Sequence, residues 1–187
     1  MQSDRIWKTR KSRIIAEKRL IRASSISNYL VIWYSFALVI VTIWNLKYPN
    51  DYLNIFLVFG SIAVLVASVV VASQKYSERS FAMRNCYLKL DELYLKFKRA
   101  EEKNDPQLLQ DLEAEYLTII QNVENHSDID YLTLRFNLRN DKDSTFYKNF
   151  FFFDYVQFFF EKAKEYFLIV LLFALPFILA YLWGLIK

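Results

Sequence analysis

The sequence contains very little of the residue types on which several large classes of protein depend. Its 187 residues include one Cys, one His, two Gly and three Pro. One Cys excludes a disulfide framework and a Cys-rich zinc site, and two Gly exclude a Gly-rich phosphate loop. No nucleophile elbow or kinase motif occurs, so we expect no enzyme, no cofactor and no metal. By contrast, 55% of the residues are hydrophobic and 24% are charged, which is typical of a membrane protein with water-exposed parts.

Three long stretches carry no charged residue. They are residues 23–46, 52–74 and 166–186. A helix of about 20 residues crosses the hydrocarbon core of a bilayer, so each stretch is long enough to span it. Pro176 interrupts the third stretch, for which a re-entrant or interfacial helix is the alternative. The sequence therefore predicts an all-α membrane protein with a tight transmembrane hairpin and a third, C-terminal transmembrane helix.

The distribution of Lys and Arg predicts the orientation of these spans. Eight cations precede the first span, whereas the loop between the first two spans contains only Lys47. Because Lys and Arg concentrate on the cytoplasmic side, we expect the N-terminus in the cytoplasm. We expect four parts, namely a basic amphipathic helix (1–23), the transmembrane hairpin (24–74), a cytoplasmic helical region (75–165) and the third span (166–186).

Residues 4–22 combine positive charge with an apolar stripe. Trp7, Ile14 and Ile21 recur every seven residues, while the other positions carry most of the cations. A basic amphipathic helix of this kind binds anionic lipid. Nucleic-acid binding is the alternative, but the adjoining span already explains the charge. We therefore expect this helix to lie along the bilayer and to bind no nucleic acid.

Two apolar seams after the second span predict an antiparallel helical hairpin, and we expect the helix with the first seam to continue the helix of the second span. The seams consist of Met83, Tyr87, Leu90, Tyr94 and Phe97, and of Leu109, Leu112, Tyr116, Ile119 and Val123. Both have the spacing of one helix face, and Asp105 with Pro106 supplies an N-cap and a first-turn proline. We expect the two helices to pack against each other, with oligomerisation through the same seams as the alternative.

A short polar element follows the second seam. Ser127 and Asp130 have the spacing of a capping box at the start of a helix that ends at Leu138. His126, Asp128 and Asp130 are alternatively potential metal ligands, but capping explains the pattern without a metal. A Phe-rich segment then precedes the third span and is expected to form an interfacial helix or an aromatic packing surface.

Small residues in the second span mark faces for close packing. They are Gly60, Ser61, Ala63, Ala67, Ser68 and Ala72. Packing against the first span is the favoured role, because the tight loop forces that contact, and lining of a pore is the alternative. None of the spans contains Asp, Glu, Lys, Arg or His, which argues against a pump. Three spans are also too few for a monomeric transporter, so any conduction requires an oligomer.

Several stretches together resemble one known family. They are TRKSRIIAEKRL, the tight hairpin, YSERSFAMRNCYLKLDELY directly after it, and NHSDIDY. On these features, which cover most of residues 7–138, the sequence resembles the SLATT proteins, bacterial two-transmembrane effectors associated with nucleotide-signalling and reverse-transcriptase conflict systems. The third span departs from the two-span pattern of that family.

The resemblance implies a function. In SLATT proteins the hairpin is thought to form or disturb a membrane pore when an upstream sensor is triggered. The resemblance thus implies an inner-membrane effector of antiphage defence that forms homo-oligomers and permeabilises or depolarises the bilayer. Its expected partners are the lipid bilayer and a sensor protein from a nucleotide cyclase or reverse transcriptase system. The alternative is a structural membrane anchor that recruits a partner protein through residues 75–165.

Overall fold

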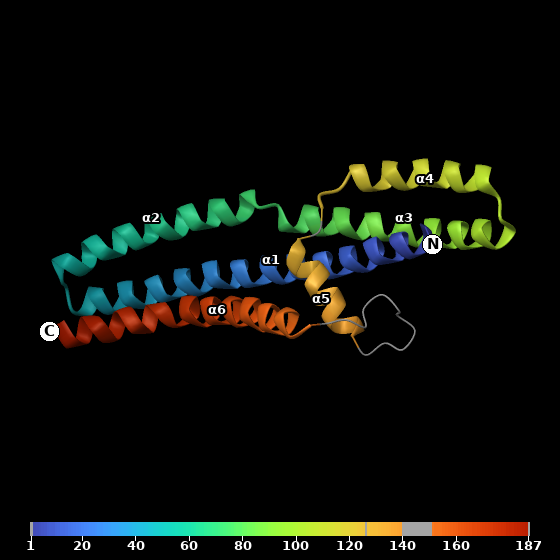
Figure 1. The fold of residues 1–187 in the computed structure, drawn as a ribbon. Coiled ribbons are helices and arrows are strands. Elements are labelled where there is room, and N and C mark those ends of the chain that lie inside the picture. Colours follow the sequence, from blue (N-terminus) through green and yellow to red (C-terminus); the bar gives the residue numbers. More distant parts are fainter. Residues whose placement is uncertain (1, 126, 140–150, 187) are drawn as a thin grey trace. The chain divides into compact units, whose positions relative to one another are not determined.

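A computed structural model describes residues 2–125, 127–139 and 151–186, with side chains between Ser3 and Tyr181. All regular elements among these residues are α-helices (Figure 1). They are α1 (Gln2–Lys47), α2 (Asp51–Ser73), α3 (Tyr76–Lys103), α4 (Pro106–Gln121), α5 (Asp128–Leu138) and α6 (Phe152–Ile186). The predicted all-α fold is confirmed, and three of the helices are long and apolar enough to cross a membrane.

The chain divides into two compact units. The first unit combines Met1–Ile21 with Ser77–Glu161, and the second combines Arg22–Tyr76 with Lys162–Lys187. Both α1 and α6 continue without a break from one unit into the other. Residue 23, where the sequence analysis places a boundary, therefore lies inside an uninterrupted helix.

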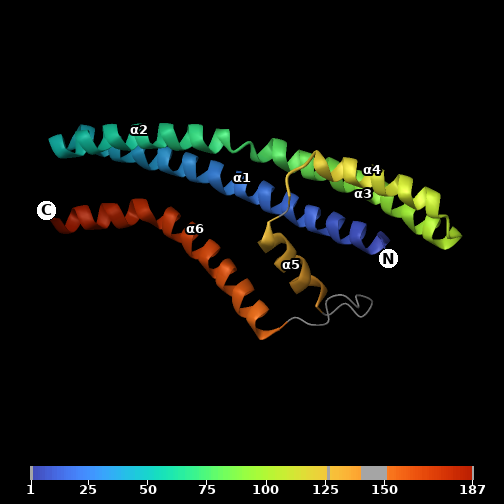
Figure 2. The same ribbon diagram turned by 45° about the horizontal axis from the view of Figure 1, so that its top comes forward.

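The core of the first unit lies among α1, α3 and α4. Figures 1 and 2 show α3 and α4 side by side and antiparallel. The turn between them contains Asn104 in the left-handed region (φ 51°), and the Asp105 side chain then accepts a hydrogen bond from the Leu108 amide over 3.1 Å. The predicted cap and hairpin are thus confirmed. The buried core cluster consists of Ile6, Cys86, Leu90, Leu93, Phe97, Ala100, Leu112 and Tyr116.

The second unit contains the tight hairpin of α1 and α2. Asn50 caps α2, because its side-chain oxygen accepts a hydrogen bond from the Leu53 amide over 3.1 Å. The Asn45 side chain accepts from the Asn50 amide over 3.1 Å and bonds to Asn54, so the reversal is held by three asparagines. This agrees with the turn predicted at residues 47–51.

The helix after the hairpin does not continue the helix of the second span, although the seam predicts that it does. α2 ends at Ser73 and α3 begins at Tyr76. Lys75 between them has a φ of 50°, in the left-handed region, which a continuous α-helix cannot contain. The expectation of one long helix is therefore wrong.

The N-terminal part of α1 buries a different side from the predicted stripe. Ile6, Ala16 and Leu20 are fully buried, whereas Ile21 is 49% exposed. The seven-residue stripe was wrong because the buried positions follow the three-four spacing of a helix that packs on neighbouring helices. The side with Ile6, Ala16 and Leu20 is therefore part of a helical core, while Trp7 and Ile14 stay half-buried.

Candidate functional site

The small residues of α2 differ in how close they lie to α1. A Cβ atom added to Gly60 would lie 2.8 Å from Leu38 Cδ2, so this glycine permits close approach of the two helices. Ser61 and Ser68 turn their hydroxyl groups onto the backbone carbonyls of Leu57 and Leu65 of their own helix. The other small residues, Ala63, Ala67 and Ala72, are exposed in the single chain. Packing against the first span therefore accounts for Gly60, and the three alanines stay candidates for contacts between copies.

The structure places the seam residues around one core, with a shift in register on α3. Met83, Leu90 and Phe97 are fully buried, whereas Tyr87 and Tyr94 lie half-buried at its edge. On α4, Leu112 and Tyr116 are buried, while Leu109, Ile119 and, just after the helix, Val123 pack against the core. Cys86, Leu93 and Ala100 also lie in the buried face, three or four residues from seam positions, although the predicted seam does not include them. Ile6 of α1 completes the core, which periodicity within α3 and α4 cannot predict, because it does not show that a third helix joins the hairpin.

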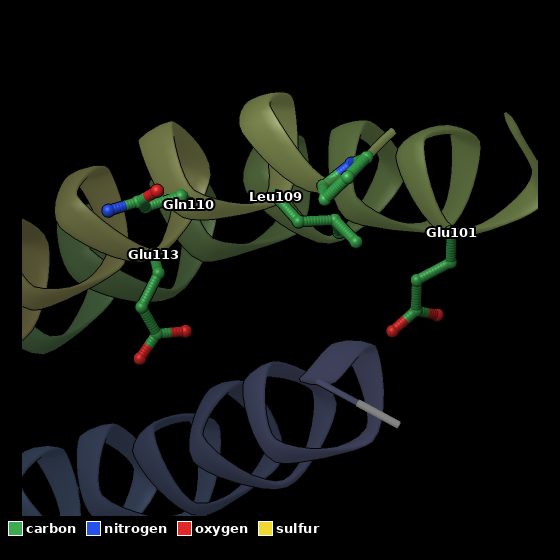
Figure 3. A pocket seen from close by; sticks show the side chains of 5 residues that line it. Glu101, Leu109, Gln110 and Glu113 are labelled. Carbon is green, nitrogen blue, oxygen red and sulfur yellow. The ribbon is translucent and has the colours of Figure 1, made fainter. Parts of the chain in front are cut away.

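The N-terminus of α1 is bound to the hairpin by polar contacts. Glu101 accepts hydrogen bonds from the Ser3 amide (3.1 Å) and the Ser3 hydroxyl (2.7 Å), so its carboxylate caps the first turn of α1. Arg5 forms an ion pair with Glu113. In Figure 3 both carboxylates line an open pocket and point toward α1. Because each carboxylate already has a partner, the pocket serves to hold α1.

Several predicted lipid-binding cations have protein partners instead. Arg5 lies over the Tyr116 ring at 4.5 Å, and Arg10 pairs with Asp91 and lies 5.9 Å from the Tyr94 ring. These contacts join α1 to both helices of the hairpin. The carboxylates of α3 and α4 thus neutralise two of the eight cations, and the expectation that this segment lies along the bilayer stays a prediction.

Arg13 is a cation in the core of the first unit. Its residue surface is 2% exposed, and its Nη1 donates to the Glu124 carbonyl over 2.8 Å. Its Nε is buried without a hydrogen-bond partner, and the other neighbour is Met83 Sδ at 3.6 Å. A buried guanidinium without a carboxylate partner lowers the stability of the fold, so packing alone does not explain an arginine at this position.

Arg19 lies two turns further along α1 and pairs with a buried carboxylate. Its Nε and Nη2 donate to the two oxygens of Asp130, which is 1% exposed, over 2.9 and 3.1 Å. Asp130 also accepts from the amide and hydroxyl of Ser127. The predicted capping role of these two residues is confirmed. Asp128 is exposed in the first turn of α5, and His126 lies outside the described residues.

A third arginine holds the same connection between α4 and α5. Arg79 Nε lies 3.0 Å from each carboxylate oxygen of Glu124. We call the three arginines and their acceptors, Glu124 and Asp130, the linker clasp. Arg13 and Arg19 belong to α1, which continues into the first span, and Arg79 lies in the first turn of α3, just after the second span. The clasp therefore joins the segment between α4 and α5 to α1, which leads into the first span, and to α3, which follows the second span.

The other end of the site joins α5 to α6. Arg135 binds the two oxygens of Asp154 over 3.0 and 2.8 Å, and Asp154 also accepts from the Phe151 amide over 2.9 Å. The Phe151 amide and the Arg135 guanidinium hold the pKa of Asp154 below its usual range. Phe136 stacks on Phe158 at 4.1 Å. α5 is thus bound to α1 near its N-terminus, through Asp130, and to α6 near its C-terminus, through Arg135 and Phe136.

The Phe-rich segment has two sides. Phe158 is buried against α5, which fits an aromatic packing surface. The opposite side is exposed and carries Phe152, Phe153, Val156, Phe159 and Phe160. The packing role is therefore shown for one side of the helix, whereas an interfacial role for the exposed side stays a prediction, and Phe150 lies outside the described residues.

Comparison with known proteins bears on this arrangement. The sequence model of SMODS and SLOG-associating 2TM effector domain family 5 matches residues 2–182. The chain belongs to this SLATT family. No curated protein and no solved structure matches it. As a SLATT protein with three apolar helices, it is a multi-pass membrane protein and a membrane effector of defence systems.

The extent of the match shows which elements form the SLATT domain here. It includes α5, the linker clasp and α6 almost to its end. The domain is described as having two transmembrane segments, yet three helices of this chain are long and apolar enough to span a bilayer. The third of these helices is therefore part of the domain.

Proposed function

We propose that this SLATT protein is a bacterial inner-membrane effector of antiphage defence that oligomerises and permeabilises or depolarises the membrane. Its N-terminus is cytoplasmic, in keeping with the cations before the first span. The action is mechanical and needs no catalytic residue. The observation that supports the proposal best is how little of the membrane-spanning surface one chain covers.

Almost no residue of the spans is fully buried in a single chain. The most apolar 18-residue windows of the first and third candidate spans contain no buried residue, and in the second only 6% of the window is buried. In a bilayer such surfaces are covered by lipid or by other helices. Ala63 and Ala67 lie on an exposed side of α2 with small-xxx-small spacing, which lets a second helix approach closely. The partner proposed for this side of α2 is a second copy of the same chain.

The linker clasp supplies a means of control. Its arginines lie on α1 and α3, and its acceptors lie at the α4–α5 connection. The clasp is open when its arginines have left Glu124 and Asp130. A sensor from a nucleotide cyclase or reverse transcriptase system controls the chain if it binds the open form better, because it then shifts the helical region from one packing to another. Because α1 is one continuous helix from this region into the first span, the shift reaches the hairpin through the backbone.

Crosslinking in the membranes of intact bacteria tests self-assembly. Ala67→Leu adds bulk on the small-residue side of α2, and Val69→Leu adds it at an exposed position roughly 160° away around the helix. We expect the wild type and Val69→Leu to give a ladder of self-multiples after phage infection. Ala67→Leu should reduce that ladder several-fold.

The same experiment separates the effector from a membrane anchor. An anchor is captured with a different protein at near-equal ratio and gives no ladder of self-multiples. That result, or a ladder that Ala67→Leu leaves unchanged, contradicts the proposed assembly through the small-residue side of α2.

A further inference from the structure

Two side chains of the first span donate hydrogen bonds to the backbone of the third span. The Tyr34 hydroxyl donates to the Leu172 carbonyl over 2.7 Å, and Trp33 Nε1 donates to the Phe173 carbonyl over 3.1 Å. The Trp33 ring also lies 5.5 Å from the Phe177 ring. All of these residues belong to the second unit. Helix carbonyls normally accept from groups of their own helix, so donors from a different helix need an explanation.

The sequence of α6 explains why the Leu172 carbonyl is available. In an α-helix this carbonyl accepts from the amide four residues later, and residue 176 is proline. Proline has no N–H group, and its ring pushes against the carbonyl four residues before it. The Leu172 carbonyl has therefore lost its intrahelical donor, and the Tyr34 hydroxyl takes the place of that donor.

The replacement matters because of the surroundings. Inside a bilayer there is no water to satisfy a freed carbonyl, and a proline in a spanning helix is tolerated where a neighbouring helix supplies the missing donor. Tyr34 is at the middle of the charge-free stretch 23–46, and Leu172 is within 166–186. The donor and the acceptor thus match in chemistry, and both lie inside charge-free stretches that can span a bilayer.

A second contact fixes the direction of the pair. Arg22 lies 3.7 Å from Glu165 and 4.8 Å from the Tyr166 ring, where the two charge-free stretches begin. Contacts therefore advance along both helices in the same order, which makes α1 and α6 parallel. Parallel helices are what a third span requires if the region between α2 and α6 stays on the side where α1 begins.

We infer that Trp33 and Tyr34 form a docking site for a proline-interrupted third span. The site binds the Leu172 and Phe173 carbonyls and sets the register of α6 on α1. α6 is thereby a permanent transmembrane segment, so the two ends of the chain lie on opposite sides of the membrane. The inference is independent of effector activity, and it adds a third, specifically bound span to a domain described by two.

Thermal unfolding of the full chain in detergent tests the docking site through a suppressor. Tyr34→Phe removes the donor and should lower the unfolding midpoint by about 2–4 °C. Pro176→Ala restores an amide that bonds to Leu172 within α6, so the Tyr34→Phe change should cost much less in that background. Tyr29→Phe is the matched control, since Tyr29 is 65% exposed on the same helix, and it should leave the midpoint unchanged.

Two results would overturn the inference. One is a change in the midpoint that does not depend on the proline, so that Tyr34→Phe costs the same in the wild-type and Pro176→Ala backgrounds. A Tyr34→Phe effect no larger than that of Tyr29→Phe has the same meaning. The other comes from a topology reporter fused to either end of the wild-type chain, which should place the two ends on opposite sides. Both ends on one side shows that α6 does not span, whatever the variants do.

Discussion

Arg19 of α1 binds Asp130 of α5 through both carboxylate oxygens, over 2.9 and 3.1 Å, and 111 residues separate the two positions. Asp130 is 1% exposed, whereas the Arg19 side chain is 37% exposed. The carboxylate is therefore desolvated, and the guanidinium supplies its charge partner while it still contacts water. The pair is the part of the linker clasp whose loss should be most costly.

Arg19→Met should destabilise the chain, because it leaves a buried carboxylate with only the Ser127 donors. We expect a loss of about 2 kcal/mol in the free energy of unfolding in detergent, which is less than for a fully buried pair. Unfolding followed by circular dichroism measures it. In an Asp130→Asn background the same substitution should cost little, and an equal cost in both backgrounds would show that the pair does not exist.

Arg13→Met should have the opposite effect on stability, although Arg13 lies on the same helix. Arg13 has a backbone carbonyl and a thioether as neighbours, and its Nε has no hydrogen-bond partner. Replacing an unpaired buried charge by an apolar chain of similar size removes a desolvation cost. We expect the free energy of unfolding to stay constant or to rise by about 1 kcal/mol. A loss as large as that of Arg19→Met contradicts this account of Arg13.

Asp154 should make the α5–α6 contact sensitive to acid. Its pKa is lowered by the Phe151 amide and by Arg135, so the carboxylate stabilises the fold above its unfolded-state pKa. This stabilisation is lost as the pH falls through the lower, folded-state pKa. Asp154→Asn should cost about 1 kcal/mol at pH 7 and nothing once the wild type is protonated. Unfolding curves between pH 7 and pH 2 measure this, and a pH-independent difference contradicts it.

Cys86 should react slowly with thiol reagents in the folded protein. It is 2% exposed, and burial raises the pKa of its thiol, although Arg13 and Lys89 act in the opposite direction. Few molecules therefore carry the reactive thiolate at neutral pH. Labelling with a maleimide at pH 7 should become fast only after unfolding. Fast labelling of the native protein would show that the core among α1, α3 and α4 is open.

Local chemistry was sufficient to predict much of the fold. The charge-free stretches, the asparagine-containing loop and the caps at Asp105 and Ser127 act within a few residues, so the sequence displays them directly. The spacing of Leu112 and Tyr116 likewise identified the buried side of α4. These features depend on the backbone geometry of one helix or one turn, which a pattern of residues determines.

The contacts of the clasp and of the docking site could not be predicted in this way. Arg13 belongs to a run of cations whose members have different partners, and nothing in the run distinguishes the one that becomes buried. Tyr34 and Leu172 are 138 residues apart. Pro176 was a partial signal, because a proline in a span implies a freed carbonyl, but the sequence does not show which helix supplies the donor.

Membrane potential is the most direct test of the proposed function. It is followed with a potential-sensitive dye in phage-infected bacteria that produce the wild type, Ala67→Leu or Val69→Leu. We expect the wild type and Val69→Leu to lose the potential before the cells stop growing, and Ala67→Leu to retain it. If wild-type cells stop growing while their membranes remain fully polarised, the chain does not act by permeabilising or depolarising the membrane.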